Sequence, residues 1–295
     1  MQNVTPLAVT ALAAELVVAG GFAFAAEWIA RTVQGWRVVV RTVAPASLAL
    51  AYVLVVAPQH SFRWAWFALY SGLPVVIAWL LGQAATVDSA RRGNWRDALI
   101  LLTLGVAVDL RWFDPAWPRG LEALGKILLV DAGLYGFLAI RQLNGTGFDL
   151  HLHWTDWKTG LRELIFFTPS VLVLGLSLGF IRPHAGVPSI GAALLRWIGI
   201  FFFVALPEEL FFRSWVQNLL ERRLGRNAAL IVASVLFGLS HFNKRNAIGA
   251  HFNWRYVLLA AIAGIFYGRA WRERRRVPAS TITHTFVDWI WSWWF

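Results

Sequence analysis

Residues 197–214 read "WIGIFFFVALPEELFFRS" and place two adjacent glutamates and an arginine within a long apolar stretch. Charged side chains inside a membrane-spanning helix are costly, and those that occur usually carry function. Glu209 and Arg213 are four residues apart, so they share one face of an α-helix. Glu208 lies about 100° around the helix from Glu209. The stretch therefore predicts a membrane helix with an internal ion pair and a second carboxylate that faces elsewhere.

The composition indicates a membrane protein. Of the 295 residues, 58% are hydrophobic and only 15% are charged, whereas about a quarter are charged in soluble domains. The chain has 18 tryptophans, and many lie near the ends of apolar segments, where indole rings settle at membrane interfaces. It has no cysteine, which excludes disulfides, thiolate nucleophiles and cysteine-ligated zinc.

Ten apolar segments are candidate spans, at about 7–30, 37–57, 62–86, 97–112, 121–141, 161–182, 188–212, 227–242, 255–271 and 278–294. Three are short for a span of about 20 residues, so the number could be eight. We therefore expect an all-α fold, a polytopic transmembrane helical bundle of about 8–10 spans with a catalytic helix core near the C-terminus.

Basic residues cluster in alternate loops between these segments, of which "RAWRERRR" at 269–276 is the strongest example. The formal charge of +11 is thus interpreted as membrane topology and contact with anionic lipid headgroups, and no nucleic-acid partner is expected. The long polar and aromatic loop at 141–160 separates the first five candidate spans from the last five. We expect an N-terminal transmembrane region at 1–160, of unassigned role, and a catalytic region at 161–295.

Most other charges inside the candidate spans are isolated along the sequence. They comprise Glu15, Asp109, Lys126, Asp131 and Arg196. Each could lie near an interface or pair with a neighbour, as Lys126 could with Asp131. We do not assign these residues to the site.

The two glutamates have different expected roles. Arg213 can neutralise Glu209, and a carboxylate held by arginine is a poor base. Glu208, without that partner, is the candidate proton acceptor. Pro207 suits the first turn of a helix, so a helix is expected to restart or kink there. A purely structural ion pair would explain Glu209 and Arg213 but would leave Glu208 unexplained.

Two histidines on later segments complete the candidate site. Glu208 lies 17 residues before Gly225 and His241 lies 16 after it, so an antiparallel helical hairpin places the two at the same depth. His284 and Asp288 are four residues apart on one face of the last segment. His284, however, is only six residues past Pro278, whereas the other two lie roughly 25 Å from their turn. The three can meet only if helices tilt or stop short of spanning.

The ordered motifs "EELFFR", "FGLSH" and "HTFVD" resemble those of the CPBP family, the CAAX-type and bacteriocin-processing intramembrane proteases, which read EExxxR, FxxxH and HxxxN. The resemblance covers about 190–290. It implies a glutamate-dependent intramembrane endopeptidase in which Glu208 activates water with help from His241, and His284 and residue 288 stabilise the oxyanion. Asp288 departs from the family's asparagine, and an ionised carboxylate cannot donate a hydrogen bond. Asp288 is therefore either protonated or orients His284.

The resemblance implies a membrane-associated peptide or protein substrate, a lipid bilayer around the protein, and no cofactor or metal. The composition favours a bacterial inner membrane. A zinc protease stays an alternative, although the HExxH pattern is absent and the other histidines, in "LHLHW" and at His251, fall in expected loops. A transporter or a non-catalytic CPBP-like scaffold is also open, although neither explains three ordered motifs.

Overall fold

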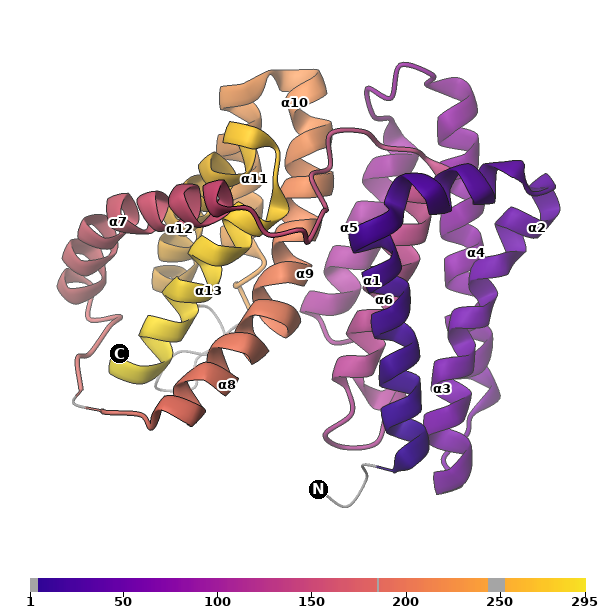
Figure 1. Cartoon of the computed structure of the whole chain (residues 1–295), viewed down its shortest axis with the longest axis horizontal. Coiled ribbons are helices and arrows are strands. Elements are labelled where there is room, and N and C mark those ends of the chain that lie inside the picture. The colour runs from indigo at the N-terminus through magenta and orange to yellow at the C-terminus, as the bar shows by residue number, and fades with distance from the viewer. Residues whose placement is uncertain (1–4, 185, 244–252) are drawn as a thin grey trace. The chain divides into compact units, whose positions relative to one another are not determined.

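The protein is all-helical in the residues that the structure, a computed structural model, describes. These are residues 5–184, 186–243 and 253–295, and helices account for 80% of the structure, with no strand among the described residues. The chain divides into two compact units, 1–144 and 145–295 (Figure 1). The functional division expected at residue 160 stays a prediction.

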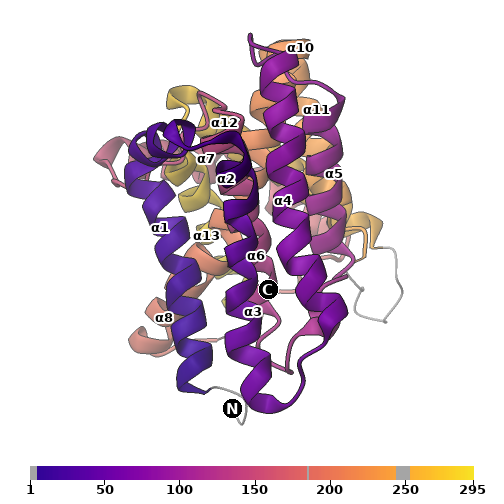
Figure 2. The ribbon, with the colours of Figure 1, turned by 90° about the vertical axis from the view of Figure 1, so that its right-hand side faces the viewer.

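The N-terminal unit is a bundle of long apolar helices. Figure 2 shows α1, α3 and α4 running side by side. Its elements are α1 (Pro6–Gly35), α2 (Val38–Val43), η1 (Ala44–Leu48), α3 (Ala49–Val56), η2 (Ala57–Gln59), α4 (Trp64–Val87), α5 (Trp95–Asp109), η3 (Asp114–Ala116), α6 (Ala123–Leu134) and η4 (Tyr135–Ile140).

The C-terminal unit carries all the residues of the candidate site. The last two helices, α12 and α13, pack on each other and on α7. Its elements are α7 (Trp154–Ser177), α8 (Ile190–Ile200), η5 (Phe201–Ala205), α9 (Leu206–Glu209), η6 (Leu210–Gln217), α10 (Asn218–Leu224), α11 (Arg226–Leu239), α12 (Trp254–Arg274) and α13 (Val277–Trp294).

The polytopic helical class is confirmed. Every one of the ten segments expected from the sequence overlaps a helix. Six helical stretches among the described residues are long and apolar enough to cross a membrane, and α11 is apolar but shorter. The six are Pro6–Gly35, Val38–Gln59, Trp64–Val87, Ala123–Ile140, Trp154–Ser177 and Ile190–Leu224.

The two glutamates lie in the middle of a continuous helix, not at the start of one. The helix Ile190–Leu224 runs through Pro207 without a break, and π-helical turns, η5 and η6, flank α9 on both sides. Proline lacks an N–H and its ring clashes with the carbonyl of the preceding turn, and a wider π-type turn relieves both problems. The expected restart is thus a change from π-helical to α-helical turns at Leu206, with Pro207 in the first α-helical turn, and the helix does not end there.

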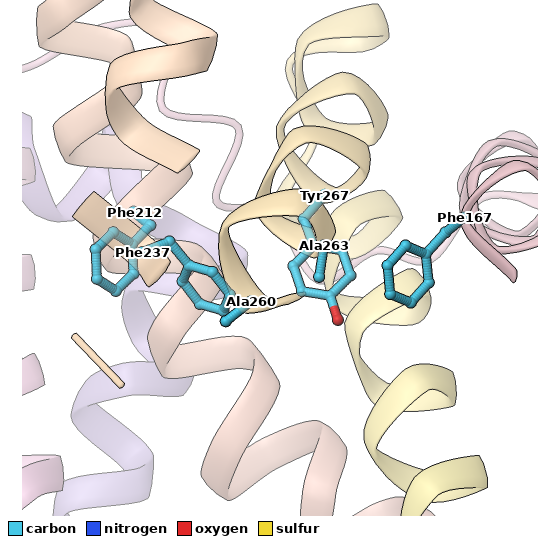
Figure 3. Packing of buried hydrophobic residues seen from close by; sticks show 6 residues of the cluster. All are labelled: Phe167, Phe212, Phe237, Ala260, Ala263 and Tyr267. Atoms are coloured by element: carbon cyan, nitrogen blue, oxygen red, sulfur yellow. The ribbon is translucent and has the colours of Figure 1, made fainter. Parts of the chain in front are cut away.

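A tight hairpin joins α10 to α11 at Gly225. Its φ of 80° is a conformation that glycine adopts without steric cost. Phe212 and Phe237, 13 residues before and 12 after this turn, pack edge to face with ring centroids 5.1 Å apart. Their contact agrees with the equal-depth register expected for the hairpin. Figure 3 shows the buried cluster that they form with Phe167, Ala260, Ala263 and Tyr267.

The first turns of α13 are buried inside the C-terminal unit, which explains how His284 reaches the other site residues. Residues 277–285 are all buried. The Val277 N–H donates to the carbonyl of Gly147 at 2.9 Å, and the Thr283 hydroxyl donates to the carbonyl of Gly160 at 3.0 Å. Arg276 pairs with Asp149 at 3.0 Å and with Asp156 at 2.7 Å. The segment that leads into α7 thus covers the start of α13, so this helix begins within the unit.

Candidate active site

Glu209 is a fully buried carboxylate with two cationic partners. Its side chain is 0% exposed, and its Oε2 accepts from Arg213 Nε at 2.9 Å, one turn along the helix. Its Oε1 lies 2.9 Å from Nδ1 of His284 on α13. Both oxygens are therefore engaged, and Glu209 links the helix Ile190–Leu224 to α13. A carboxylate that is buried and held by two cations is a poor proton acceptor.

Arg213 is enclosed by aromatic rings on its other sides. Its side chain is 0% exposed, and its guanidinium carbon lies 5.1 Å from the ring centroid of Phe237 and 5.9 Å from that of Tyr267. Its Nη1 and Nη2 have no hydrogen-bond partner among the described residues. The rings offer their negative faces to the charge instead.

His284 lies at the centre of the candidate site. Its ring is 3% exposed and stacks on Tyr267 with centroids 4.5 Å apart and an interplanar angle of 16°. Its Nε2 faces Asp288 Oδ2 at 3.5 Å and Glu208 Oε2 at 3.9 Å. Carboxylates thus face both ring nitrogens, and an imidazolium, which donates from both, satisfies this arrangement.

Glu208 is the carboxylate that stays available. Its side chain is 37% exposed, and its Oε2 is enclosed but has no hydrogen-bond partner among the described residues. Its ion-pair contact, with His284 Nε2 at 3.9 Å, is longer than a hydrogen bond. Because its side chain is partly exposed and no described residue holds it at hydrogen-bond distance, Glu208 can accept a hydrogen bond from a water molecule or a substrate.

His241 lies beyond the end of α11 and is 8% exposed. Its Nδ1 lies 2.9 Å from the carbonyl oxygen of Phe237. Because a carbonyl only accepts, Nδ1 carries a proton, and Nε2 is the acceptor of the neutral ring. Its ring packs on Tyr256 at 4.7 Å. In the described residues His241 joins the site through Phe237 and Tyr256 and makes no ion pair with either glutamate.

The structure brings together five of the six residues expected at the site through direct polar contacts. They are Glu208, Glu209, Arg213, His284 and Asp288. Two tyrosines of α12, Tyr256 and Tyr267, were missed by the sequence reasoning. They lie eleven residues apart, three helical turns, and so share a face. The available signal was their spacing on a helix next to the two histidine motifs.

Two of the isolated charges of the N-terminal unit, Glu15 and Asp131, are buried carboxylates. Lys126 is exposed, whereas Asp131 is 0% exposed and its carboxylate has no hydrogen-bond partner among the described residues. The Lys126–Asp131 pair considered above is thus not formed, because residues five apart point about 140° away from each other on a helix. Across the described residues, no group of three or more His, Cys, Asp or Glu side chains is arranged to hold a metal ion. His251 lies outside the described residues.

The fold and this buried group of carboxylates, arginine and histidine define a polytopic helical integral membrane protein with a candidate hydrolytic site. Residues 190–290 match the family model described as Rce1-like, type II CAAX prenyl endopeptidase Rce1-like. This segment contains all three motifs and confirms the resemblance to the CPBP family drawn from them. No match was found among curated proteins or among solved structures.

Proposed function

We propose that the protein is a glutamate-dependent intramembrane endopeptidase that cleaves a membrane-associated peptide or protein, in CAAX-type or bacteriocin- or sorting-type processing. The match over 190–290 supports a CAAX-type intramembrane protease, a peptide hydrolase, in general. The roles of individual residues, the substrate and a bacterial inner membrane as the location are parts of the proposal. So is the assignment of catalysis to the C-terminal part of the chain and not to residues 1–160.

The observation that carries the proposal is the difference between the two adjacent glutamates. Both oxygens of Glu209 are taken by Arg213 and His284 at 2.9 Å each. Glu208 keeps an oxygen without a hydrogen-bond partner among the described residues, 3.9 Å from His284 Nε2. A general base must be reachable by the proton donor and must not be neutralised by cations. Glu208 is partly exposed and has no cation at hydrogen-bond distance, whereas Glu209 is 0% exposed and is held by two cations, so Glu208 is the better placed base.

In the proposed reaction Glu208 removes a proton from water while the water oxygen forms a bond to the carbonyl carbon of the substrate. The carbonyl π electrons move to the oxygen and give a tetrahedral oxyanion. When this intermediate collapses, the C–N bond breaks and the leaving nitrogen takes the proton from Glu208. The products are a carboxylic acid and an amine, and the carboxylate of Glu208 is regenerated.

The two histidines have complementary proposed roles. Because Nδ1 of His241 donates to the Phe237 carbonyl, its Nε2 can hold the attacking water as an acceptor. His284, with its Nδ1 fixed on Glu209, carries a donor at Nε2 on the side of Glu208 and Asp288, where an oxyanion can accept its hydrogen bond. Asp288, 3.5 Å from Nε2, orients His284 and does not itself donate.

The proposal is tested with Glu208→Gln, which keeps the shape of the side chain and removes the proton acceptor. Membrane proteins whose termini change when the variant replaces the wild type are identified by mass spectrometry and then used as substrates for purified protein. We expect cleavage to fall by about 10²-fold or more with an unchanged melting temperature. Glu273→Gln is the matched control. It removes a carboxylate at the C-terminal end of α12 that pairs with Arg162. Normal cleavage by Glu208→Gln contradicts the proposal, and an absence of any changed terminus favours a non-catalytic scaffold.

A further inference from the structure

The carboxylates at the candidate active site are open to their surroundings, whereas its described cations are enclosed. The side chains of Glu208 and Asp288 are 37% and 29% exposed. Those of Arg213 and His284 are 0% and 3% exposed. Both open carboxylates flank the same atom, His284 Nε2. The surface that the described residues of the site offer to a substrate is therefore negative.

The single charge of Glu209 compensates one of the two enclosed cations, Arg213 and His284. Glu209 lies between Arg213 and His284, 2.9 Å from each. His241 has Nδ1 on the carbonyl of Phe237 and makes no ion pair with a carboxylate among the described residues. One imidazolium thus stands between two open carboxylates, and this leaves one negative charge without a partner among the described residues.

An aromatic wall lies next to these carboxylates. The rings of Phe180, Tyr256 and Trp291 contact one another with centroids 5.3–5.4 Å apart. Trp291 lies three residues after Asp288 on α13, so the two share a helix face, and Tyr256 packs on the ring of His241 at 4.7 Å, so this wall borders the candidate site. Carboxylates beside aromatic rings are the combination that binds ammonium and guanidinium groups.

We propose that the site selects peptides carrying a lysine or arginine side chain close to the cleaved bond, and that Asp288 determines this selectivity. The inference rests on the proposed endopeptidase function and names its substrate class. A cationic side chain gains the attraction of the unpartnered carboxylate, whereas an acidic side chain is repelled by it. The net charge of the chain, +11, acts in the opposite direction, so a preference for cations must come from the site itself.

The test uses a pool of palmitoylated peptides with randomised sequences in nanodiscs of zwitterionic lipid. Purified protein cleaves the pool, and mass spectrometry gives the frequency of Lys and Arg relative to Asp and Glu within three residues of each cut. We expect wild-type protein to enrich cations about tenfold, which corresponds to about 1.4 kcal/mol. Asp288→Asn, the neutral isostere, should bring this ratio close to one, whatever its overall rate. Glu273→Gln, the control carboxylate, should keep the wild-type ratio.

A wild-type ratio of one or less overturns the inference, and so does an Asp288→Asn variant with the wild-type ratio. Where Asp288→Asn does not fold, the wild-type ratio is measured from low to high salt, and it must fall as screening increases. Where wild-type protein cleaves nothing, the proposed function fails. Fluorescence anisotropy then compares binding of a palmitoylated peptide with three lysines to one with three glutamates. Equal binding by wild type and Asp288→Asn also overturns the inference.

Discussion

His284 Nδ1 lies 2.9 Å from Glu209 Oε1, although the two residues are 75 positions apart in the chain. The same carboxylate holds Arg213 through its other oxygen, also at 2.9 Å. Glu209 thus fixes two cations at once and joins the helix Ile190–Leu224 to α13. Glu209 therefore does more than neutralise Arg213, because it also holds His284 in position.

Glu209→Gln is expected to destabilise the protein before it affects chemistry. The amide cannot match the charges of Arg213 and His284, and leaving buried cations without their anion costs on the order of 3–5 kcal/mol. We expect a lower melting temperature in detergent and a lower folded yield, with cleavage lost in proportion to folding. Melting and cleavage are measured on the same sample. Glu208→Gln is the comparison, because it should show the reverse pattern, and a Glu209→Gln protein that melts normally contradicts this role.

Arg213→Ala removes the cation from a carboxylate that is 0% exposed. We expect a loss of stability on the order of 3–5 kcal/mol, because a buried charge loses its partner. Arg213→Lys should recover only part of it, since an ammonium cannot reach Glu209 with the same geometry or lie flat against the Phe237 and Tyr267 rings. Thermal melting of the purified wild type, Arg213→Ala and Arg213→Lys proteins gives their order of stability. Equal melting of the wild type and Arg213→Ala would show that the pair contributes nothing.

Gly147→Ala tests the contact that sets where α13 begins. Gly147 has a φ of +70°, and a Cβ there would lie 1.9 Å from the backbone oxygen of Arg275, closer than any two such atoms approach. Gly145→Ala is the matched control, since its φ is +66° but the nearest atoms lie at 3.6 Å. Both variants incur the left-handed strain of about 1–2 kcal/mol, and only Gly147→Ala must displace backbone. We expect a much lower folded yield for Gly147→Ala, and equal yields would show that the contact is not needed.

Asp149 should make stability depend on pH in the acidic range. Burial raises the pKa of this loop carboxyl, but hydrogen bonds from the backbone and ring of His151 and from Arg276 outweigh it and hold the pKa below its ordinary value. A carboxyl with a lowered pKa stabilises the fold above its unfolded value, about 3.9. That contribution is lost as the pH falls toward the folded value.

We therefore expect the melting temperature of the wild type to fall more steeply below about pH 4 than that of Asp149→Asn. Above pH 5 the variant should melt lower than the wild type. Melting curves across the acidic range check both statements. Parallel curves for the two proteins would show that Asp149 contributes no such dependence.

Cleavage is expected to be independent of metal. Glu208 and Glu209 are accounted for as a base and an ion-pair partner, and the described residues contain no group of three potential ligands arranged around a metal position. Incubation with a strong chelator, followed by removal of the chelate, should leave the rate unchanged. Loss of cleavage that returns when zinc is added would support the zinc protease instead.

Sequence reasoning succeeded where contacts are local along one helix or across one tight turn. Glu209 and Arg213 are four residues apart, and their contact follows from the helical repeat. The register of Phe212 and Phe237 follows from counting residues on either side of Gly225. The restart expected at Pro207 takes the form of a change from π-helical to α-helical turns within a continuous helix, and the sequence did not show that π-helical turns would flank the proline.

The sequence by itself determined the helical membrane class and the ion pair on one helix face, and it named six candidate site residues, because hydropathy and helical spacing act over a few turns. Only the tertiary structure decided that His284 reaches Glu209 and that Tyr267 stacks beneath it. His284 is only six residues past Pro278, so it could meet Glu208 and His241 only if α13 began inside the C-terminal unit. It does so because residues 145–160 supply Gly147, Asp149, Asp156 and Gly160 as partners for its first turns. These contacts join segments more than a hundred residues apart, and no local periodicity encodes them.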